Sequence, residues 1–339
     1  MRSPPPLPRR HALALLALPW CAAPRAQAPA SPVLVRFSHV VAPDTPKGRM
    51  ALRFKALAEA RSRGRVLVQI YPDSQLYGDD DEMEALQLGA VELLAPSLSK
   101  FGNVGVPAFE VFDLPFLFDD LAQVRRVTQG PIGQELLLRL DRQQMVGLGY
   151  LDNGFKHMSA GRPLRTPADF RGLRLRVQAS RVLSGQMRAL GAQPVVLPFG
   201  ETQRALAAGV VQGAENPLSN FLTQGLAPLQ RDLTLTRHGY LGYAVVTSQR
   251  FWRRLAAPDR ELLAGALADA IDESHRQAED TERQALETLR QLPGVRLHSV
   301  DAPQRAALRA AVQPVYDDFE RRVGADLLRA VERAKAQTP

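Results

Sequence analysis

The first half of the chain alternates short apolar runs with longer segments in which apolar residues recur three and four positions apart. The short runs predict strands over 33–37, 66–71 and 91–95, and the longer segments predict helices over 46–63 and 82–88. This strand–helix–strand–helix–strand order is typical of a parallel sheet with helices on both faces. The pattern therefore predicts an α/β fold for this half.

A second unit of the same kind is predicted from Gly149 to Asn216, so we expect two α/β lobes. Its clearest part begins with the strand pattern LRLRV at 173–177. Beyond it, the pattern predicts a helix over 180–190, an extended segment over 193–197, a helix over 201–208 and a strand over 210–215.

The last third is dominated by one long amphipathic helix, predicted over 258–292. Apolar residues at Leu262, Leu263, Leu267, Ile271, Ala278, Leu286 and Leu289 recur at helical spacing. Packing against the sheets is the simplest interpretation of this apolar stripe. Strand patterns over 232–247 precede this helix, and a further helical stretch over 302–335 follows it.

The N-terminus has the pattern of a secretory signal peptide. Residues 1–30 contain no acid, and Arg9 and Arg10 precede an apolar run that ends at Trp20. Small residues follow, with an Ala-Pro-Ala pattern that predicts cleavage near Ala30. The arginine pair fits twin-arginine export and the general secretory route equally well. No later stretch reaches the roughly 18 uninterrupted apolar residues of a membrane-spanning helix.

Charge and cysteine content narrow the classes of function. The whole chain carries a net charge of +8, of which four charges lie in residues 1–30, leaving +4 for the remainder. Basic residues alternate with acids along the predicted helices, a pattern of solvated faces that does not predict nucleic-acid binding. Cys21 is the only cysteine, so the exported chain would have no disulfide and no thiol chemistry.

An exported α/β protein could be a hydrolase, and the motifs of the common enzyme classes would then be expected in the chain. The chain has no G-x-S-x-G, no H-E-x-x-H and no Walker loop. The acidic run over 79–82 lacks the spacing of a calcium loop, and acids at a helix N-terminus explain it better. We therefore expect no metal, no cofactor and no catalytic residue.

Arg176 is the residue in the strand pattern 173–177 that needs an explanation. Alternation places Arg174 and Arg176 on one strand face and the three apolar residues on the other. Spacing alone favours a solvated basic face, because most charges on strands remain exposed. A buried guanidinium is the alternative, since its planar fork matches a carboxylate with two parallel hydrogen bonds.

Long motifs throughout the chain resemble the solute-binding proteins of tripartite ATP-independent periplasmic (TRAP) transporters, in the branch that binds four-carbon dicarboxylates. These motifs are FSHVVAPDTPKG at 37–48, YPDSQLYGDDDEMEALQLGAVELLAPSLSKFG at 71–102, FEVFDLPFLF at 109–118, DNGFKHMSA at 152–160, the segment 173–220 and HGYLGYAVV at 238–246. The resemblance implies a two-lobe Venus-flytrap fold of the TRAP type, with crossing strands and a long hinge-spanning helix.

The resemblance also implies a set of binding residues. Arg176 matches the arginine that grips the ligand carboxylate, and Asn216 matches the amide that completes the grip. Gln178 shares a strand face with Arg176, and Phe199 resembles an aromatic wall behind the ligand, with core packing as the alternative. Further candidates are Lys156 and Ser97, at positions where sialic-acid-binding relatives carry arginine and glutamate, and the polar donors Lys47, His39 and Lys100, for which a solvated loop position is the alternative.

The expected organisation is a signal peptide over 1–30, lobe 1 over 31–152, lobe 2 over 153–238, and a crossing strand, hinge helix and C-terminal helices over 239–339. The resemblance implies a periplasmic receptor that binds malate, succinate or fumarate and delivers it to a TRAP permease. We expect the receptor to be a monomer and to bind no nucleic acid. Gln203 stands where close relatives carry tyrosine. A monocarboxylate or aromatic-acid receptor, a periplasmic hydrolase and a ligand-presenting partner of a sensor kinase remain alternatives.

Overall fold

The computed structural model describes residues 1, 3 and 32–336. The predicted signal peptide and its cleavage site therefore lie outside the described residues, apart from two isolated positions. Among the helices of the described part, none is both long and apolar enough to cross a membrane.

The N-terminal strands and helices form as predicted. β1 (Val33–Ser38) pairs in parallel with β2 (Val66–Tyr71) and with the short β3 (Leu93–Leu94). Helices α1 (Pro46–Ser62) and α2 (Glu82–Leu88) connect them. The first turn of α1 is fixed by Thr45, whose hydroxyl accepts a 3.1 Å hydrogen bond from the Gly48 amide, and by Pro46 at the first helical position.

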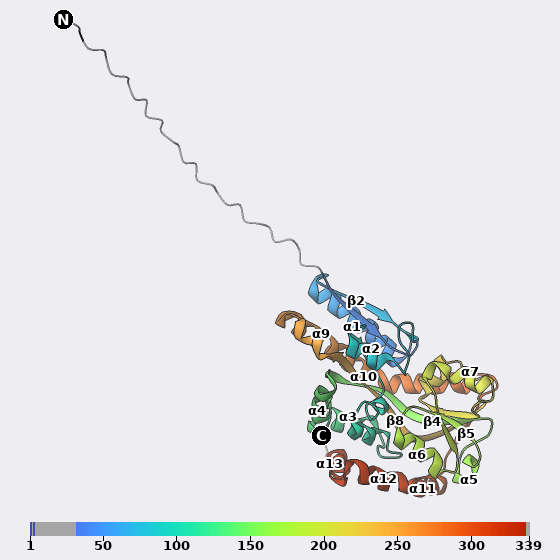
Figure 1. The fold of residues 1–339 in the computed structure, drawn as a ribbon. Helices are drawn as coiled ribbons and strands as arrows, with labels where there is room; N and C mark the ends of the chain where they lie inside the picture. The colour runs from blue at the N-terminus through green and yellow to red at the C-terminus, as the bar shows by residue number, and fades with distance from the viewer. Residues whose placement is uncertain (2, 4–31, 337–339) are drawn as a thin grey trace. The chain divides into compact units, whose positions relative to one another are not determined.

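Two long antiparallel strands join this group to the rest of the sheet. β4 (Met145–Ala160) and β8 (Asp232–Ser248) pair along most of their length, with register shifts near Gly147, Asp152 and Lys156. The strand order is β2-β1-β3-β8-β4-β7-β5-β6, with β9 (Arg296–Ser299) also pairing with β8. Figure 1 shows β4 and β8 running between β2 with α1 and β5 with α6. The expected crossing strand is thus confirmed as a pair, of which the sequence patterns indicated only β8.

The second strand group carries the predicted second unit. β5 (Arg174–Val177) pairs in parallel with β6 (Gln193–Val196) and β7 (Gly213–Asn216), and β7 pairs antiparallel with β4. Its helices are α6 (Arg181–Ala189), capped by Ser180, then α7 (Thr202–Ala207) and α8 (Leu218–Thr223). The boundary expected between residues 152 and 153 falls inside β4, which belongs to both strand groups.

The predicted long helix is α10 (Ala257–Gln291), which packs against α1, β4 and α8. Its N-terminal half shares one apolar core with β1, β2 and α1, and its C-terminal half shares another with α7 and α8. The largest core joins β4, α6 and the C-terminal helices. The remaining helices are α3 (Leu121–Thr128), α4 (Pro131–Arg139), α5 (Pro167–Phe170), α9 (Gln249–Arg254), α11 (Ala302–Ala311), α12 (Gln313–Val323) and α13 (Ala325–Ala336), with 3₁₀ turns at Leu98–Lys100, Pro107–Asp113, Leu140–Gln143 and Phe199–Glu201.

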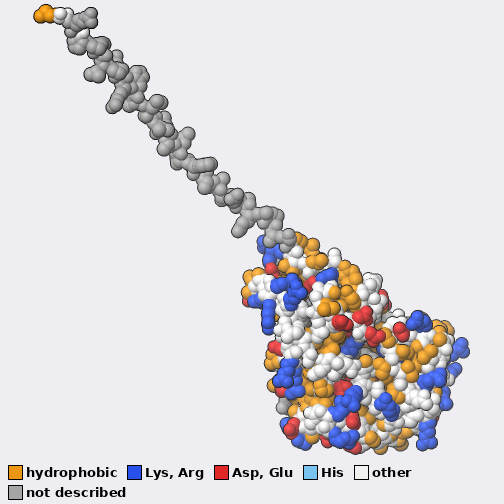
Figure 2. Space-filling view, viewed as in Figure 1, with side chains coloured by type: hydrophobic (Ala, Val, Ile, Leu, Met, Phe, Trp, Pro, Cys, Tyr) orange, Lys and Arg blue, Asp and Glu red, His pale blue; other side chains and the backbone are white. Residues whose placement is uncertain are grey.

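The described surface mixes charges of both signs. Figure 2 shows basic, acidic and apolar side chains interspersed over the face in view, without a continuous basic stripe. Ion pairs three and four residues apart on the helices, such as Arg139 with Glu135, account for part of this pattern.

Candidate functional site

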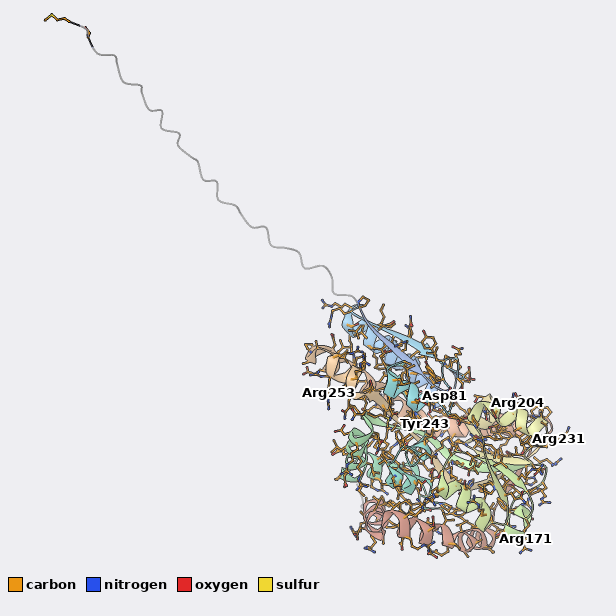
Figure 3. The ribbon with its side chains drawn as sticks, in the orientation of Figure 1. Asp81, Arg171, Arg204, Arg231, Tyr243 and Arg253 are labelled. Atoms are coloured by element: carbon orange, nitrogen blue, oxygen red, sulfur yellow. The ribbon has the colours of Figure 1, made fainter. Side chains whose placement is uncertain are left out.

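A small cavity lies where the two strand groups meet across β4 and β8. The space between its lining atoms, including the open solvent at its mouth, is about 380 Å³, and the lining residues lie on α1, α2, β4, β5, β7, α8, β8 and the loops beside them. Tyr243 of β8, which borders the cavity, lies in the interior, whereas the labelled arginines Arg204, Arg231 and Arg253 lie at the periphery (Figure 3). The lining consists of Val40, Val41, Lys47, Asp79, Glu82, Ser97, Lys156, Arg176, Gln178, Phe199, Glu215, Asn216, Asn220, Leu241 and Tyr243.

The structure brings seven of the nine candidate binding residues to this cavity: Lys47, Ser97, Lys156, Arg176, Gln178, Phe199 and Asn216. They come from segments up to 169 residues apart, between Lys47 and Asn216. Of the other two, Lys100 lies behind the lining, where it pairs with Asp79 and Glu82, and His39 is not part of the lining either. Its ring is fully buried, lies edge-on to Phe37 and has no hydrogen-bond partner on either nitrogen among the described residues. Burial and the nearby Lys47 lower the pKa of His39 to about 3, so the ring is neutral.

Arg176 is a buried cation without an anionic partner among the residues that the structure describes. Its side chain is 2% exposed, although that of Arg174, two residues earlier in β5, is exposed. Its Nε donates a 2.9 Å hydrogen bond to the Leu197 carbonyl, and the guanidinium lies 5.9 Å from the centre of the Phe199 ring. Among the described residues it forms no salt bridge. Burial lowers the pKa of Arg176, although Asp79 and Glu215 oppose this effect. The prediction of a solvated basic face therefore holds for Arg174 alone.

Lys47 is a second buried cation without a salt-bridge partner among the described residues. Its Nζ donates a 3.0 Å hydrogen bond to the Ala95 carbonyl and lies 3.9 Å from the centre of the Tyr243 ring. Its position in the first turn of α1 places a positive charge at the positive end of the helix dipole, which is unfavourable. Burial lowers the pKa of Lys47 to about 8. An anion in the cavity would offset both the unfavourable interaction with the helix dipole and the cost of burying the charge.

Lys156, in contrast, is neutralised inside the protein. Its Nζ lies 2.8 Å from Glu215 Oε1, and both side chains are 1% exposed. The other Glu215 oxygen lies 2.8 Å from Nε2 of His238, and Nδ1 of that ring lies 2.7 Å from the Thr236 hydroxyl. Burial lowers the pKa of His238, so we assign a neutral ring that donates from Nε2 to Glu215. This chain of contacts fixes β4, β7 and β8 to one another.

The acidic run before α2 contributes two carboxylates to the lining. Asp79 and Glu82 both form salt bridges with the buried Lys100, and Asp79 also accepts a hydrogen bond from the Phe199 amide. Burial raises the pKa of Glu82, against the opposing effect of Lys100. α2 does begin at Glu82, as the sequence indicated, but two of these four acids face the cavity while Asp81 is exposed.

The remaining predicted residues supply neutral polar groups. Gln178 Nε2 donates a 3.0 Å hydrogen bond to the Ser97 hydroxyl, which links β5 to the segment after β3. The side-chain nitrogen of Asn216 is buried and has no acceptor among the described residues. Phe199 is 7% exposed and closes the side of the cavity next to Arg176.

Sequence reasoning did not identify eight lining residues as part of the site: the polar Asp79, Glu82, Glu215, Asn220 and Tyr243, and the apolar Val40, Val41 and Leu241. Glu215 had a usable signal, because a buried lysine at Lys156 requires a counter-charge and the adjacent Asn216 was already assigned. Asn220 accepts a 2.9 Å hydrogen bond from Asn153 of β4, a contact that only the strand pairing reveals.

Gly48 is expected to be required for the position of Lys47. A Cβ at this position would overlap the carbonyl oxygens of Ala42 and Pro43, which are backbone atoms and cannot rotate away. We expect Gly48→Ala to lower the free energy of unfolding by about 1–3 kcal/mol, measured by urea denaturation. Gly265→Ala is the matched control, because a Cβ at this position in α10 would lie 3.8 Å from its nearest neighbour, the Arg61 guanidinium of α1. Equal stability of the two variants would contradict this account.

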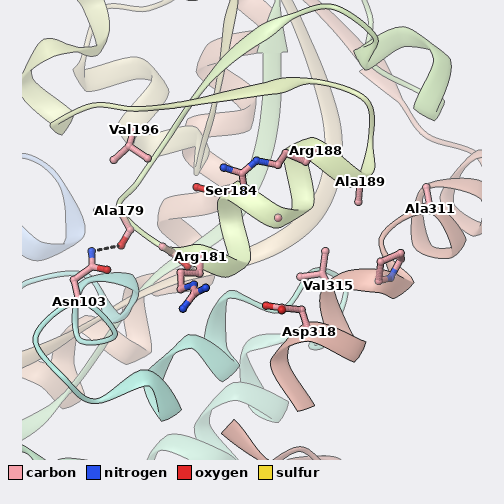
Figure 4. A pocket seen from close by; sticks show the side chains of 13 residues that line it. Asn103, Ala179, Arg181, Ser184, Arg188, Ala189, Val196, Ala311, Val315 and Asp318 are labelled. Carbon is pink, nitrogen blue, oxygen red and sulfur yellow. Dashed lines mark hydrogen bonds between the residues drawn. The ribbon is translucent and has the colours of Figure 1, made fainter. Parts of the chain in front are cut away.

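A larger cleft lies on the surface beside α6, with α11 and α12 on its other side (Figure 4). Asn103 donates a 3.0 Å hydrogen bond to the Ala179 carbonyl at its edge. Its charged side chains Arg181 and Arg188 are exposed, so the cleft lacks the buried, unpaired charges of the internal cavity. Within residues 32–336, no group of three or more His, Cys, Asp or Glu side chains could hold a metal ion.

Comparisons with known proteins agree on one family. The family model described as bacterial extracellular solute-binding protein, family 7, matches residues 37–322. The C4-dicarboxylate-binding periplasmic protein DctP of Rhodobacter capsulatus is 47% identical over 308 residues, which cover 91% of this chain and 92% of that protein.

Solved structures confirm the two-lobe α/β fold. A TRAP periplasmic solute-binding protein of Shewanella oneidensis with bound succinate is 41% identical, with a TM-score of 0.88 over 90% of this chain and 99% of that one. One from Pseudomonas aeruginosa with bound L-malate is also 41% identical, with a TM-score of 0.82 over 85% of this chain and all of that one. This chain therefore belongs to family 7 of the bacterial extracellular solute-binding proteins.

Proposed function

We propose that this protein is a periplasmic receptor for a four-carbon dicarboxylate such as succinate, malate or fumarate, which it delivers to a TRAP membrane permease. The observation that carries the proposal is a pair of buried cations in one cavity, Arg176 and Lys47, neither of which forms a salt bridge with any of residues 32–336. Two such cations match the two carboxylates of a dianion. Similar proteins with bound succinate and L-malate support the same ligand class.

The two cations belong to different strand groups, which accounts for closure around the ligand. Arg176 is on β5, beyond β4 and β7, and Lys47 is on α1, which packs on the side of β1 and β2. A ligand that joins them stabilises the closed arrangement of the lobes by the difference between its affinities for the closed and open forms. The ligand is released unchanged, and we propose no catalytic step.

In the proposed complex, Arg176 holds one carboxylate through its guanidinium fork, with the unpaired Asn216 amide as a second donor. Lys47 holds the other carboxylate. Lys156 acts as a structural cation, because Glu215 already neutralises it. Gln178 and Ser97 order the cleft, and Phe199 forms its wall. His39 is left out of the binding set.

Export to the periplasm, with signal-peptide cleavage near Ala30, is part of the proposal. The family is named for extracellular solute-binding proteins, and residues 1–30 have the composition of a signal peptide. Mass determination of the N-terminus of the exported protein tests the cleavage position.

A calorimetric panel of acids tests the ligand class. We expect succinate, malate or fumarate to bind the purified protein more tightly than butyrate and benzoate, which each carry only one carboxylate. Tighter binding of a monocarboxylate or an aromatic acid would overturn the dicarboxylate assignment and favour a receptor of the same fold for another acid. Conversion of a bound acid, followed by NMR, would show an enzyme instead.

Lys47→Met should weaken succinate binding while leaving butyrate binding within about threefold of wild type. A hydrogen bond to a charged group contributes about 1.5–3 kcal/mol, which corresponds to roughly a 10- to 150-fold loss of succinate affinity. Lys55→Met is the matched control, because this lysine on the same helix pairs with Glu59 at the surface. An equal loss for both acids would show that Lys47 does not hold the second carboxylate.

A further inference from the structure

The net charge of the groups around the cavity is too small to neutralise a dianion. Lys47, Lys156 and Arg176 line it together with Asp79, Glu82 and Glu215, and Lys100 lies behind the first two of these acids. If all of these groups are ionised, the described residues contribute one more cation than anions. A bound dicarboxylate therefore leaves a closed, buried site with one excess negative charge, which is strongly unfavourable in a medium of low polarity.

Glu82 is the anion in the lining with a free oxygen. Its side chain is 1% exposed, and Oε1 forms the salt bridge with Lys100. Oε2 is buried and has no hydrogen-bond partner among the described residues. A second anion brought to this oxygen would be repelled, whereas a proton on Oε2 turns the same group into a hydrogen-bond donor.

Glu82 is surrounded by charged and titratable groups from four segments. These are Lys47 from α1, Asp79 from the loop before α2, Lys100 from the 3₁₀ turn after β3, and Tyr243 from β8. Burial raises the pKa of Glu82 and of Tyr243, so the tyrosine stays neutral. Asp79 is the better paired of the two acids, since it also accepts the Phe199 amide, and its pKa is lowered by Lys100 in spite of its burial. The proton is thus more stable on Glu82 than on Asp79.

We propose that the cavity takes up one proton with each dicarboxylate and that Glu82 holds it. The proposal rests on the function proposed above. The proton comes from the solvent and forms an O–H bond at Oε2 as the dianion enters. Binding is then favoured by lower pH wherever Glu82 is ionised in the free protein and protonated in the complex.

Two other groups could take up the proton and are separated by the experiment. Lys47, with a pKa of about 8, is mostly charged at pH 7.0 already and can take up only about one tenth of a proton there. Asp113 is a buried carboxyl near Lys156, with its pKa raised by burial to about 6, but it does not line the cavity.

Calorimetry of succinate binding at pH 7.0 in buffers of different ionisation enthalpy counts the protons directly. We expect close to one proton taken up per succinate in the wild-type protein and about 0.1 in Glu82→Gln, whose amide oxygen can still accept from Lys100. Asp113→Asn should take up the same number of protons per succinate as the wild-type protein. Glu92→Gln, a carboxylate that pairs with Arg36 outside the cavity, is the matched control and should also take up that number.

A second measurement, the affinity of wild-type protein for fumarate between pH 6 and 7, does not depend on any variant folding. We expect the affinity to fall as pH rises, by up to about tenfold per pH unit. Succinate binding without proton uptake, or uptake that persists in Glu82→Gln or disappears in Asp113→Asn, would overturn this inference while leaving the receptor function intact. Failure of succinate, malate and fumarate to bind at any pH would instead remove the proposed function.

Discussion

Arg176→Ala is expected to weaken succinate and malate binding by roughly 30-fold to several thousandfold. Removing one partner of a buried charge pair costs about 2–5 kcal/mol, because the ligand carboxylate is left without a counter-charge in a site closed to water. Arg176→Lys should recover only part of this loss, since an ammonium group cannot form two parallel hydrogen bonds to one carboxylate. Isothermal titration calorimetry measures both affinities.

Stability separates a binding role for Arg176 from a structural one. In the structure this guanidinium is buried with a single hydrogen bond, to the Leu197 carbonyl, and no salt bridge to a described residue. Removing it should therefore leave the melting temperature of the ligand-free protein unchanged or raise it. Arg174→Ala, two residues away on the same strand and exposed, should keep wild-type affinity. Unchanged affinity of Arg176→Ala for succinate would contradict the assignment of Arg176 as the residue that binds a ligand carboxylate.

The fold was largely predictable because most of its helices and strands have strong local signals. The N-terminal strand–helix order and the helix at Ala257–Gln291 follow from apolar spacing alone, and the structure confirms them within a few residues. β4 was the main strand that the sequence patterns did not predict. Its sequence, MVGLGYLDNGFKHMSA, contains three glycines and buried polar residues, so it lacks a strand pattern, and its pairing with β8 is what makes it a strand.

The binding role of Arg176 was predicted from the family resemblance, because the spacing of its strand alone favoured a solvated face. Arg176 stands in an apolar strand, and its burial follows from its position between β6 and β7. The sequence did not show which of the buried lysines is paired with an acid and which is not. Lys156 and Lys47 are both lysines in polar motifs, and only the contact between Lys156 and Glu215, 59 residues away and one strand over, shows that one is neutralised and the other is not.

The acids of the lining were misjudged for a related reason. The run at residues 79–82 fits a helix N-terminus, and α2 does start there. Whether a given acid in such a run faces solvent or the interior depends on the loop that precedes the helix and on Lys100, which attracts both Asp79 and Glu82 inward. Local propensity explains the start of the helix but not the burial of these side chains.

Glu215→Gln is expected to destabilise the protein by about 3–5 kcal/mol. The substitution leaves Lys156, which is 1% exposed, buried without a counter-charge. Chemical denaturation measures the change in the free energy of unfolding. Glu135→Gln is the control, because this glutamate pairs with Arg139 at the surface, where an ion pair contributes less than about 1 kcal/mol. Adding Lys156→Met to Glu215→Gln should recover part of the loss, since the double variant no longer buries an unpaired cation.

The pH dependence of this effect has a defined sign. Burial alone would raise the pKa of Glu215, but Lys156 and the hydrogen bond from His238 outweigh it and lower the pKa from 4.5 to about 2. A carboxyl with a depressed folded-state pKa stabilises the protein fully above its unfolded value and loses that contribution as pH falls towards the folded value, here about 3 kcal/mol in all. The difference in stability between wild type and Glu215→Gln should therefore be constant above about pH 5 and shrink below pH 4.5. A difference that stays constant down to pH 3, or one that grows, would show that Glu215 is not the anion that stabilises Lys156.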